Sequence, residues 1–455
     1  MALRTESIHG QWSSRWAFIL AAVGSAVGLG NIWKFPYVVS ENGGAAFVLV
    51  YLLCVFLVGI PIMMSEVLLG RRGRQNPVDT MSSLAEEAGK PKGWRFVGWS
   101  GIAAGFIILS FYSVIAGWTL AYVIRTISGT FSGASPEFVD QTFGSLLASP
   151  GELIFWHTLF LGLTLLVVIR GVSGGIERAA KLLMPSLFVL LLIMVFYAMS
   201  SGGFGQAVNF LFSADFSKIT AEGVLIALGQ AFFSLSLGMG AIMVYGSYLP
   251  KGTSIAKTSI IIALMDTLVA LMAGLAIFPI VFANGLEGGA IQSVGLIFNT
   301  LPIAFGQMTA GTLFGTLFFI LLVFAAWTSA ISLIEPAVTW LVENKNLTRK
   351  KAVLISGAII WLLGLGTVFS FNIWSDYKLF GLNFFENLDF LASNIMLPLG
   401  GLAIAVFAGW MMAKSSTREE LQIENETLYN VWLFLVRVVA PAAVTFVFLK
   451  AIGLL

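Results

Sequence analysis

A glycine-rich break interrupts the first apolar stretch of the chain, which is long enough to span a membrane. Residues 24–31 read Gly-Ser-Ala-Val-Gly-Leu-Gly-Asn. A helix in lipid cannot leave backbone amides and carbonyls unpaired unless another group binds them. Three glycines lower the free-energy cost of local unwinding, and the released backbone groups can bind an ion or a zwitterion. This break predicts a membrane transporter.

The composition agrees with a protein that crosses the membrane many times. Of the 455 residues, 58% are hydrophobic and 11% are charged, whereas soluble domains carry about 25% charged residues. A net charge of +2 without a basic cluster gives no indication of nucleic-acid binding. The single cysteine, Cys54, excludes a disulfide framework. His9 and His157 lack acidic or thiol neighbours at metal-ligand spacing, and His157 is expected to be a satisfied interior residue.

The hydropathy pattern predicts an all-α integral membrane protein with eleven transmembrane helices. The apolar segments run over residues 15–38, 44–70, 96–128, 152–170, 180–200, 222–249, 257–283, 311–342, 352–372, 385–413 and 428–455. No cleavable signal peptide is expected, because the first apolar run is too long and carries the break.

The distribution of basic residues predicts the orientation in the membrane. With the N-terminus inside, the tail and the inner loops carry nineteen of the 25 lysines and arginines. The outer loops and their flanks carry four, namely Arg125, Lys218, Lys378 and Lys450. The positive-inside rule therefore places residues 1–14 as a tail in the cytoplasm and the C-terminus outside a cell membrane.

A second break, Ser234–Gly240, lies in the sixth apolar segment, and its Leu-Gly-Met-Gly matches the Val-Gly-Leu-Gly of the first. The two spans cross the bilayer in opposite senses, which predicts inverted halves over residues 15–200 and 222–413, with 428–455 as an additional span. Two broken helices in corresponding positions indicate a binding site at the membrane midplane. The alternative is a pair of glycine stripes for helix packing. Asn31 and Ser234 favour binding, because they add polar groups to the glycines.

These motifs resemble the neurotransmitter:sodium symporters, in particular the bacterial amino-acid transporters. The resemblance covers nearly the whole chain, and its strongest stretches are residues 24–36, 41–47, 59–61 with Glu66, 229–238, and Thr328-Ser329. It implies a five-plus-five inverted repeat in which helices 1 and 6 are broken, with the eleventh helix outside the repeat.

The resemblance implies two sodium sites. The first would use Ala26, Asn31, Ser234 and Asp266 together with the substrate carboxylate. Many relatives have Asn where this chain has Asp266, so its charge predicts transport that does not need chloride; the alternative is an acid that only hydrogen-bonds between helices. The second site would use the carbonyls and hydroxyls of Gly24, Val27, Ala325, Thr328 and Ser329.

Two further residues have open interpretations. Gly175 and Pro185 match a spacing with which relatives unwind the inner half of the fifth helix. A plain loop glycine and a packing kink explain them equally well.

The resemblance also implies a site for an α-amino acid. The Leu29 and Gly30 amides and the Tyr112 hydroxyl would bind the carboxylate, and the amino group would meet oxygens of Ala26, Phe233, Ser234 and Ser236. The side-chain pocket would be formed by Ile108, Phe233, Ser236, Gly238, Met239, Ser329 and Leu333. Met239 is adaptable, so aliphatic and aromatic L-amino acids are both expected. Individually, each of these apolar residues is more often part of an ordinary core.

Gates are expected at both ends of the site. Lys34 and Asp389 would close the outer side above Phe233, and Trp12 and Glu343 the inner side. The basic partner at the inner gate stays open among Arg4, His9 and Arg15. Glu66 is expected to be structural, and Glu335 to belong to a polar network in the inner half.

The leading hypothesis is a sodium-coupled symporter of hydrophobic amino acids that works by alternating access. Proton coupling through Asp266 or Glu66 is the alternative within the transporter class, and an amino-acid sensor or channel on the same fold is the alternative outside it. An enzyme is not expected, because no intramembrane catalytic cluster or cofactor motif is present. Sodium, an amino acid and the lipid bilayer are the expected partners.

Overall fold

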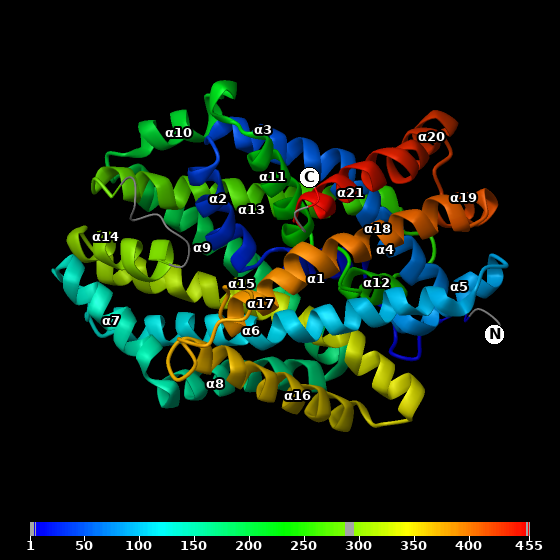
Figure 1. The fold of residues 1–455 in the computed structure, drawn as a ribbon, viewed down its shortest axis with the longest axis horizontal. Helices are drawn as coiled ribbons and strands as arrows, with labels where there is room; N and C mark the ends of the chain where they lie inside the picture. The colour runs from blue at the N-terminus through cyan, green and yellow to red at the C-terminus, as the bar shows by residue number, and fades with distance from the viewer. Residues whose placement is uncertain (1–3, 5, 287–294, 452–453, 455) are drawn as a thin grey trace.

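The computed structural model describes residues 4, 6–286, 295–451 and 454. Its helices run mostly along one direction, which is horizontal in Figure 1. Within the described part, the only β pairing is an isolated bridge between Leu379 and Leu382. The first residues of the predicted tail and the last of the segment 428–455 lie outside the described residues.

Nine helices in the described ranges are long and apolar enough to cross a membrane without a break. They are Ala45–Gly73 (α3 to α4), Lys92–Ile127 (containing α6, Arg95–Ile127), Pro150–Ile169 (α8), Val172–Met199 (containing α9, Glu177–Met199), Ile255–Ala283 (α13), Gly311–Lys345 (α15), Arg349–Ser370 (α16), Phe384–Met411 (containing α17, Phe384–Asp389, and α18, Leu397–Val406) and Glu426–Lys450 (α20 to α21).

The two remaining spans are the interrupted ones. Helix α1 (Arg15–Ala26) is bent by 53° against the segment Gly30–Glu41, which consists of a π-helical turn and α2 (Phe35–Glu41). Helices α11 (Ala221–Ser234) and α12 (Ala241–Ser247) lie on either side of the second break, and each is shorter than a membrane span. The predicted all-helical membrane fold, with breaks in its first and sixth spans, is confirmed.

Short helices mark the two ends of the bundle (Figure 1). The N-terminus, α5 (Pro77–Glu87) and α19 (Lys414–Leu421) lie at one end, which we call the tail end. Helices α7 (Pro136–Ala148), α10 (Phe204–Phe212) and α14 (Leu301–Gln307) lie at the other, which we call the far end.

Close helix contacts surround the two breaks. Helix α1 packs against α9, α13 and α15, and α15 packs along α6. Small residues allow these approaches: a Cβ atom on Gly105 would lie 2.7 Å from the Leu333 carbonyl oxygen. On α4, a Cβ on Gly70 would lie 1.9 Å from the Met243 carbonyl oxygen, so only glycine fits where α4 meets α12.

The fifth span differs from the expected segment 180–200. It begins earlier, with a π-helical turn at Val172–Ile176, and α9 continues without a break through Pro185. A Cβ on Gly175 would lie 2.1 Å from the Val167 carbonyl oxygen, so this glycine serves a tight turn. Gly175 therefore lies inside the span and not in a loop, and α9 is helical on both sides of Pro185, so this segment is not unwound in this structure.

Candidate functional site at the two helix breaks

The break after α1 is short and tightly enclosed. Val27 is extended, with φ −71° and ψ 113°, and ends the helix. A Cβ on Gly28 would lie 2.6 Å from Ser329 Oγ and 2.8 Å from the Tyr112 hydroxyl. A Cβ on Gly30 would lie 2.9 Å from the Phe233 ring. A larger residue at either position would therefore displace side chains that line the break.

The break between α11 and α12 covers residues 235–240 and has a different backbone. Ser236, Gly238 and Gly240 have φ values of 55°, 81° and 75°, in the left-handed region. The Ser236 hydroxyl donates to the Ser25 carbonyl oxygen at 2.8 Å, which joins this break to the end of α1. The Gly238 amide donates to Glu66 Oε1 at 2.5 Å. Glu66 thus holds the unwound segment, which agrees with the structural role expected for it.

The residues of the first expected sodium site lie together. Asn31 Nδ2 donates to Ser234 Oγ at 3.0 Å and to Asp266 Oδ1 at 2.7 Å. Ser234 Oγ donates to Asp266 Oδ2 at 2.5 Å. All three side chains are buried. The amide oxygen of Asn31 accepts from the Gly28 amide at 3.1 Å, so it faces the backbone break. Ala26, the fourth expected ligand, is buried at the end of α1.

The residues of the second expected site also converge. Ser329 Oγ lies 3.0 Å from the Val27 carbonyl oxygen and 3.4 Å from that of Gly24. Thr328 Oγ1 donates to the Ala325 carbonyl oxygen at 3.0 Å within its own helix, as isolated threonines in helices do. A Cβ on Gly24 would lie 3.1 Å from Thr328 Cβ, so the two helices are in contact here. These oxygens are neutral, the type of ligand that suits a hard monovalent cation.

The expected substrate residues surround the same breaks. The Leu29 amide donates to the Tyr112 hydroxyl oxygen at 3.2 Å. Ile108, Met239 and Leu333 are buried, and Phe233 is half-buried. Polar backbone groups and an apolar wall therefore meet in one place, as a zwitterion with an apolar side chain requires.

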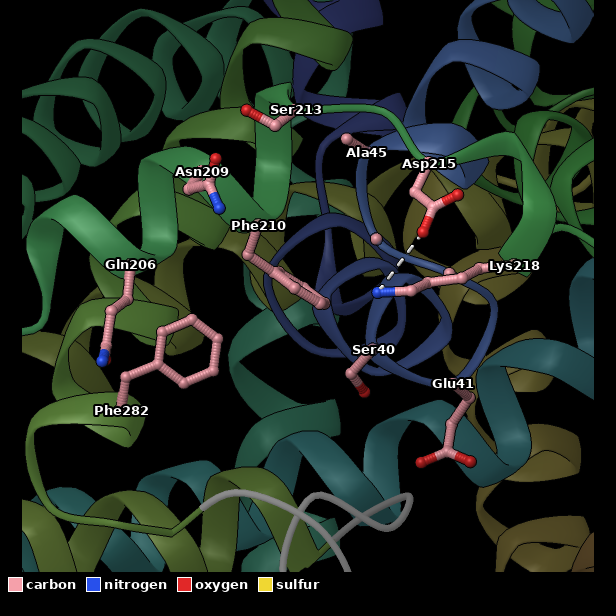
Figure 2. A pocket seen from close by; sticks show the side chains of 12 residues that line it. Ser40, Glu41, Ala45, Gln206, Asn209, Phe210, Ser213, Asp215, Lys218 and Phe282 are labelled. Atoms are coloured by element: carbon pink, nitrogen blue, oxygen red, sulfur yellow. Dashed lines mark ion pairs between the residues drawn. The ribbon is translucent and has the colours of Figure 1, made fainter.

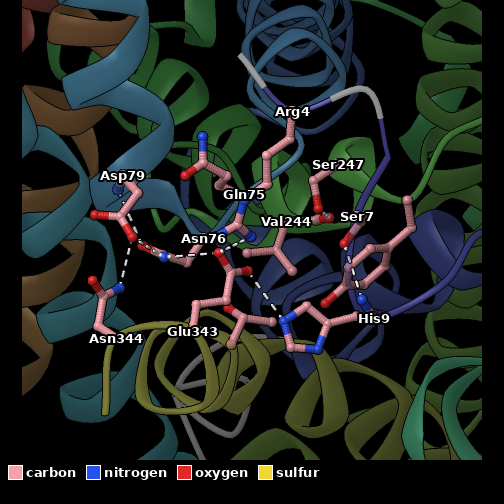
Figure 3. A network of polar contacts seen from close by, with 12 residues as sticks. Arg4, Ser7, His9, Gln75, Asn76, Asp79, Val244, Ser247, Glu343 and Asn344 are labelled. Atoms are coloured by element: carbon pink, nitrogen blue, oxygen red, sulfur yellow. Dashed lines mark hydrogen bonds and ion pairs between the residues drawn. The ribbon is translucent and has the colours of Figure 1, made fainter. Parts of the chain in front are cut away.

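A polar network closes the tail end of the site (Figure 3). Glu343 accepts hydrogen bonds from Arg4 Nη1 at 2.9 Å, from His9 Nε2 at 3.1 Å and from Asn76 Nδ2 at 3.3 Å. Of the three open candidates, both Arg4 and His9 contact Glu343. The Trp12 indole donates to the Tyr245 carbonyl oxygen at 2.9 Å.

A second acid supports this end. Glu335 accepts from the Tyr248 hydroxyl at 2.8 Å and from Arg349 Nη2 at 2.6 Å. The Trp12 amide donates to the Tyr248 carbonyl oxygen at 3.1 Å. The expected role of Glu335 in a polar network agrees with these contacts, and Arg349 was not anticipated from the sequence.

The interactions at the far end are different. Lys34 Nζ lies 4.5 Å from the centroid of the Phe233 ring, a cation–π contact. Asp389 accepts from Ser393 Oγ at 2.8 Å. Among the described residues Lys34 and Asp389 form no ion pair, so the expected outer pair is not made in this structure.

Four side chains at the site were missed by the sequence reasoning. The Tyr51 hydroxyl donates to Ser234 Oγ at 3.3 Å, and Ser25 Oγ donates to Ser332 Oγ at 2.7 Å. Gln230 Nε2 donates to the Gly30 carbonyl oxygen at 2.9 Å. The sequence offered one usable signal, since Gln230 is a polar residue in an apolar segment four positions before Ser234.

Other features lie away from the breaks. His157 accepts or donates a hydrogen bond with Ser113 at 3.0 Å and lies 3.4 Å from the Trp361 carbonyl oxygen, as expected for a satisfied interior residue. A cavity of about 720 Å³ lies between the loop after α2 and α10, where Lys218 and Asp215 are 3.8 Å apart (Figure 2). Across the described ranges, no group of three His, Cys, Asp or Glu residues is suited to a metal ion.

An all-helical membrane fold whose interrupted helices meet at clustered oxygen atoms defines an ion-coupled transporter. The profile of the sodium:neurotransmitter symporter family matches residues 9–143 and 135–454. The chain belongs to this family. It is therefore a sodium-dependent symporter with many membrane spans, and sodium is its coupling ion. The resemblance stated from the motifs is confirmed.

Individual relatives support this assignment. An uncharacterized sodium-dependent transporter of Bacillus subtilis (strain 168) is 40% identical over 98% of both chains. One from Haemophilus influenzae is 35% identical, over 96% of this chain and 97% of the relative. The crystal structure of MhsT in complex with L-phenylalanine matches with a TM-score of 0.90 and 44% identity, covering 97% of this chain and 99% of that one.

Proposed function

We propose that the chain imports hydrophobic L-amino acids, aliphatic and aromatic, together with sodium. The observation that carries the proposal is the junction of the two breaks, where Ser236 Oγ donates to the Ser25 carbonyl oxygen at 2.8 Å beside the cluster of Asn31, Ser234 and Asp266. Unwound backbone at membrane depth is tolerated where it binds a ligand. MhsT, the solved relative, is described in complex with L-phenylalanine, which supports the substrate class.

In this proposal the first sodium ion binds Asn31, Ser234, Asp266 and the Ala26 carbonyl oxygen. The ion replaces the hydrogen bonds that Asn31 Nδ2 and Ser234 Oγ now make to the carboxylate. For Asn31 to become a ligand, its amide must turn so that Oδ1 leaves the Gly28 amide. Freeing this amide next to Leu29 would couple sodium binding to the carboxylate site of the substrate.

The second sodium ion would bind the carbonyl oxygens of Gly24, Val27 and Ala325 and the hydroxyls of Thr328 and Ser329. Ser329 Oγ already lies near two of these carbonyl oxygens, at 3.0 and 3.4 Å. Since the ligands come from α1 and α15, the ion would hold these helices together. This arrangement would make closure of the tail end depend on sodium.

The substrate carboxylate would bind the amides of Leu29 and Gly30 and the Tyr112 hydroxyl. Its amino group would bind the carbonyl oxygens of Ala26, Phe233 and Ser234 and the Ser236 hydroxyl. No acid lies in the first break, so a carboxylate-bearing substrate is favoured over an amine alone. The apolar side chain would contact Ile108, Gly238, Met239, Ser329 and Leu333, where an unbranched methionine can accommodate different shapes.

Asp266 makes chloride unnecessary in this proposal. A carboxylate near the bilayer centre costs about 2.5–3.5 kcal/mol unless it is neutralised. A sodium ion beside Asp266 would neutralise it, and the carboxylate would in turn supply the negative charge needed next to the ion.

Transport would proceed by alternating access between the halves 15–200 and 222–413, with 428–455 outside the repeat. Lys34 and Asp389 would gate the far end and Trp12 and Glu343 the tail end. The excess of basic residues in the tail and the tail-end loops favours a cytoplasmic N-terminus and an extracellular C-terminus in the cell membrane.

Uptake into proteoliposomes tests the proposal. An inward sodium gradient should concentrate labelled L-phenylalanine and L-leucine above the outside level, also in chloride-free gluconate buffer. Replacement of sodium by potassium at constant pH should abolish accumulation. Accumulation that instead follows a proton gradient would favour proton coupling, and binding without accumulation would favour a sensor or channel. Loss of uptake without chloride would exclude the proposed role of Asp266.

A further inference from the structure

A cationic cavity of about 280 Å³ lies at the tail end, away from both breaks. Five basic residues line this cavity. Three come from the end of α4 (Ile60–Gly73) and the turn after it, one from the N-terminal tail and one from the loop after α12. These five basic residues are Arg71, Arg72, Arg74, Arg4 and Lys251. The cavity also includes two acids of α19, Glu419 and Glu420.

The two acids are already engaged by two of the arginines. Arg71 pairs with Glu420 through its Nε atom. Arg72 donates to Glu419 at 3.1 Å and also to Glu87 at 2.5 Å. Both acids therefore have arginine partners, and among the described residues neither forms an ion pair with Arg74 or Lys251.

Arg74 is buried without a carboxylate partner among the residues that the structure describes. Its side chain donates through Nη1 to the carbonyl oxygens of Ser247 at 3.2 Å and Leu249 at 2.5 Å. Its Nε atom is buried and has no hydrogen-bond partner in the described part of the chain. Burial lowers the pKa of Arg74, partly offset by the charges of Glu420 and Glu6. A buried guanidinium is unfavourable without a counter-charge, so the cavity is suited to an anion.

The cavity lies where a membrane span ends, which is the depth at which lipid headgroups are expected. The membrane span Ala45–Gly73 ends one residue before Arg74. Lys251 is exposed at the rim and has no ion-pair partner among the described side chains. Arginine binds phosphate with a planar fork and lysine binds it as a point charge, so the pair is a suitable combination for a phosphate group.

We propose that this cavity binds a phosphate group, with Arg74 and Lys251 as its principal ligands and Arg4 at its edge. The phosphate belongs either to an anionic lipid headgroup or to a free phosphate compound. This site is independent of the proposed substrate class. Arg4 also donates to Glu343. A phosphate bound in the cavity would therefore lie next to the polar network at the tail end.

The test uses the purified full-length protein in nanodiscs at constant sodium and ionic strength, balanced with chloride. The midpoint of thermal unfolding is followed by tryptophan fluorescence. One arm compares phosphatidylglycerol with phosphatidylcholine discs, and the other titrates inorganic phosphate and pyrophosphate into phosphatidylcholine discs. A midpoint that rises with phosphatidylglycerol alone identifies a lipid headgroup, and one that rises with soluble phosphate identifies a free compound.

Variants connect the effect to the cavity. Lys251→Gln should weaken the midpoint response about fivefold in apparent affinity, as the loss of one lysine near a phosphate surface implies. Lys257→Gln is the matched control, an exposed lysine close in sequence that does not line the cavity. No rise with either probe, or equal responses of the two variants, would overturn the proposal. Neither outcome bears on amino-acid uptake.

Discussion

The two ends of the broken-helix site are held by different interactions. At the tail end, one carboxylate, Glu343, accepts from Arg4, His9 and Asn76, and its side chain is only 1% exposed. At the far end, the ammonium group of Lys34 lies 4.5 Å from the Phe233 ring, and Asp389 is bonded to Ser393 instead of to the lysine.

These contacts indicate which end resists opening more strongly. Hydrogen bonds to charged groups contribute roughly 1.5–3 kcal/mol each, and a buried acid that loses its partners is costly. A cation–π contact at an exposed site contributes about 0.5–1 kcal/mol. We infer that the far end opens more readily than the tail end, which suits a carrier that receives its cargo at the far end and releases it at the tail end.

Both ends are proposed to enclose the first sodium site, and Asp266→Asn tests that site most strongly. Removing a negative charge about 4 Å from a cation costs up to roughly 4 kcal/mol at an effective dielectric constant of 20. We expect sodium affinity to fall about a hundredfold in chloride-free buffer and to recover partly with chloride. Sodium-dependent binding of labelled substrate to the purified variant measures this. Unchanged affinity with no anion effect would remove Asp266 from the site.

The substitution Glu343→Gln tests whether the polar network holds the tail end closed. Arg4 and His9 would lose their shared carboxylate, a loss of about 2 kcal/mol, or about a thirtyfold change in the ratio of open to closed tail end. A cysteine introduced at Val244, which is buried beside this network, should then react faster with a maleimide in a Cys54→Ala background. Glu424→Gln is the control, because Glu424 is exposed and outside the network. Equal labelling rates would show that Glu343 does not hold this end closed.

Much of the fold and of the site was accessible from the sequence, and the exceptions have physical reasons. Asn31 and Ser234 could be found because polar residues beside glycines are costly in an apolar helix. Tyr51 could not, because a tyrosine in an apolar segment reads as an ordinary core or interface residue. The basic partner of Glu343 could not be chosen among Arg4, His9 and Arg15. The N-terminal tail has no helical periodicity from which the positions of its side chains could be predicted. The contact of Lys34 with Phe233 depends on how the helices at the far end are placed in this conformation. The spacing of residues in the sequence does not predict that placement.

A smaller effect is expected when one donor of the tail-end network is removed. His9→Ala deletes the hydrogen bond to Glu343 at 3.1 Å and the ring contact with Tyr248 at 6.0 Å. The loss of about 1.5 kcal/mol should raise labelling at Val244 about tenfold, less than Glu343→Gln does. Ile8→Ala serves as the control, since Ile8 is 62% exposed. An effect of His9→Ala as large as that of Glu343→Gln would mean that the hydrogen bonds of Arg4 and Asn76 to Glu343 do not help to hold the tail end closed.

The smallest effect is expected at the far end, from substitutions of Lys34. Lys34→Gln removes a contact of about 0.5–1 kcal/mol, so labelled sodium should leave the purified protein about two- to fivefold faster. Lys34→Arg should act in the opposite direction, because a guanidinium can form a bidentate pair with Asp389 that the lysine does not make here. The double variant Lys34→Arg with Asp389→Asn should lose this gain. If Lys34→Gln instead slowed release, or changed it as much as Glu343→Gln changes tail-end labelling, the two ends would be equivalent and the proposed asymmetry would be wrong.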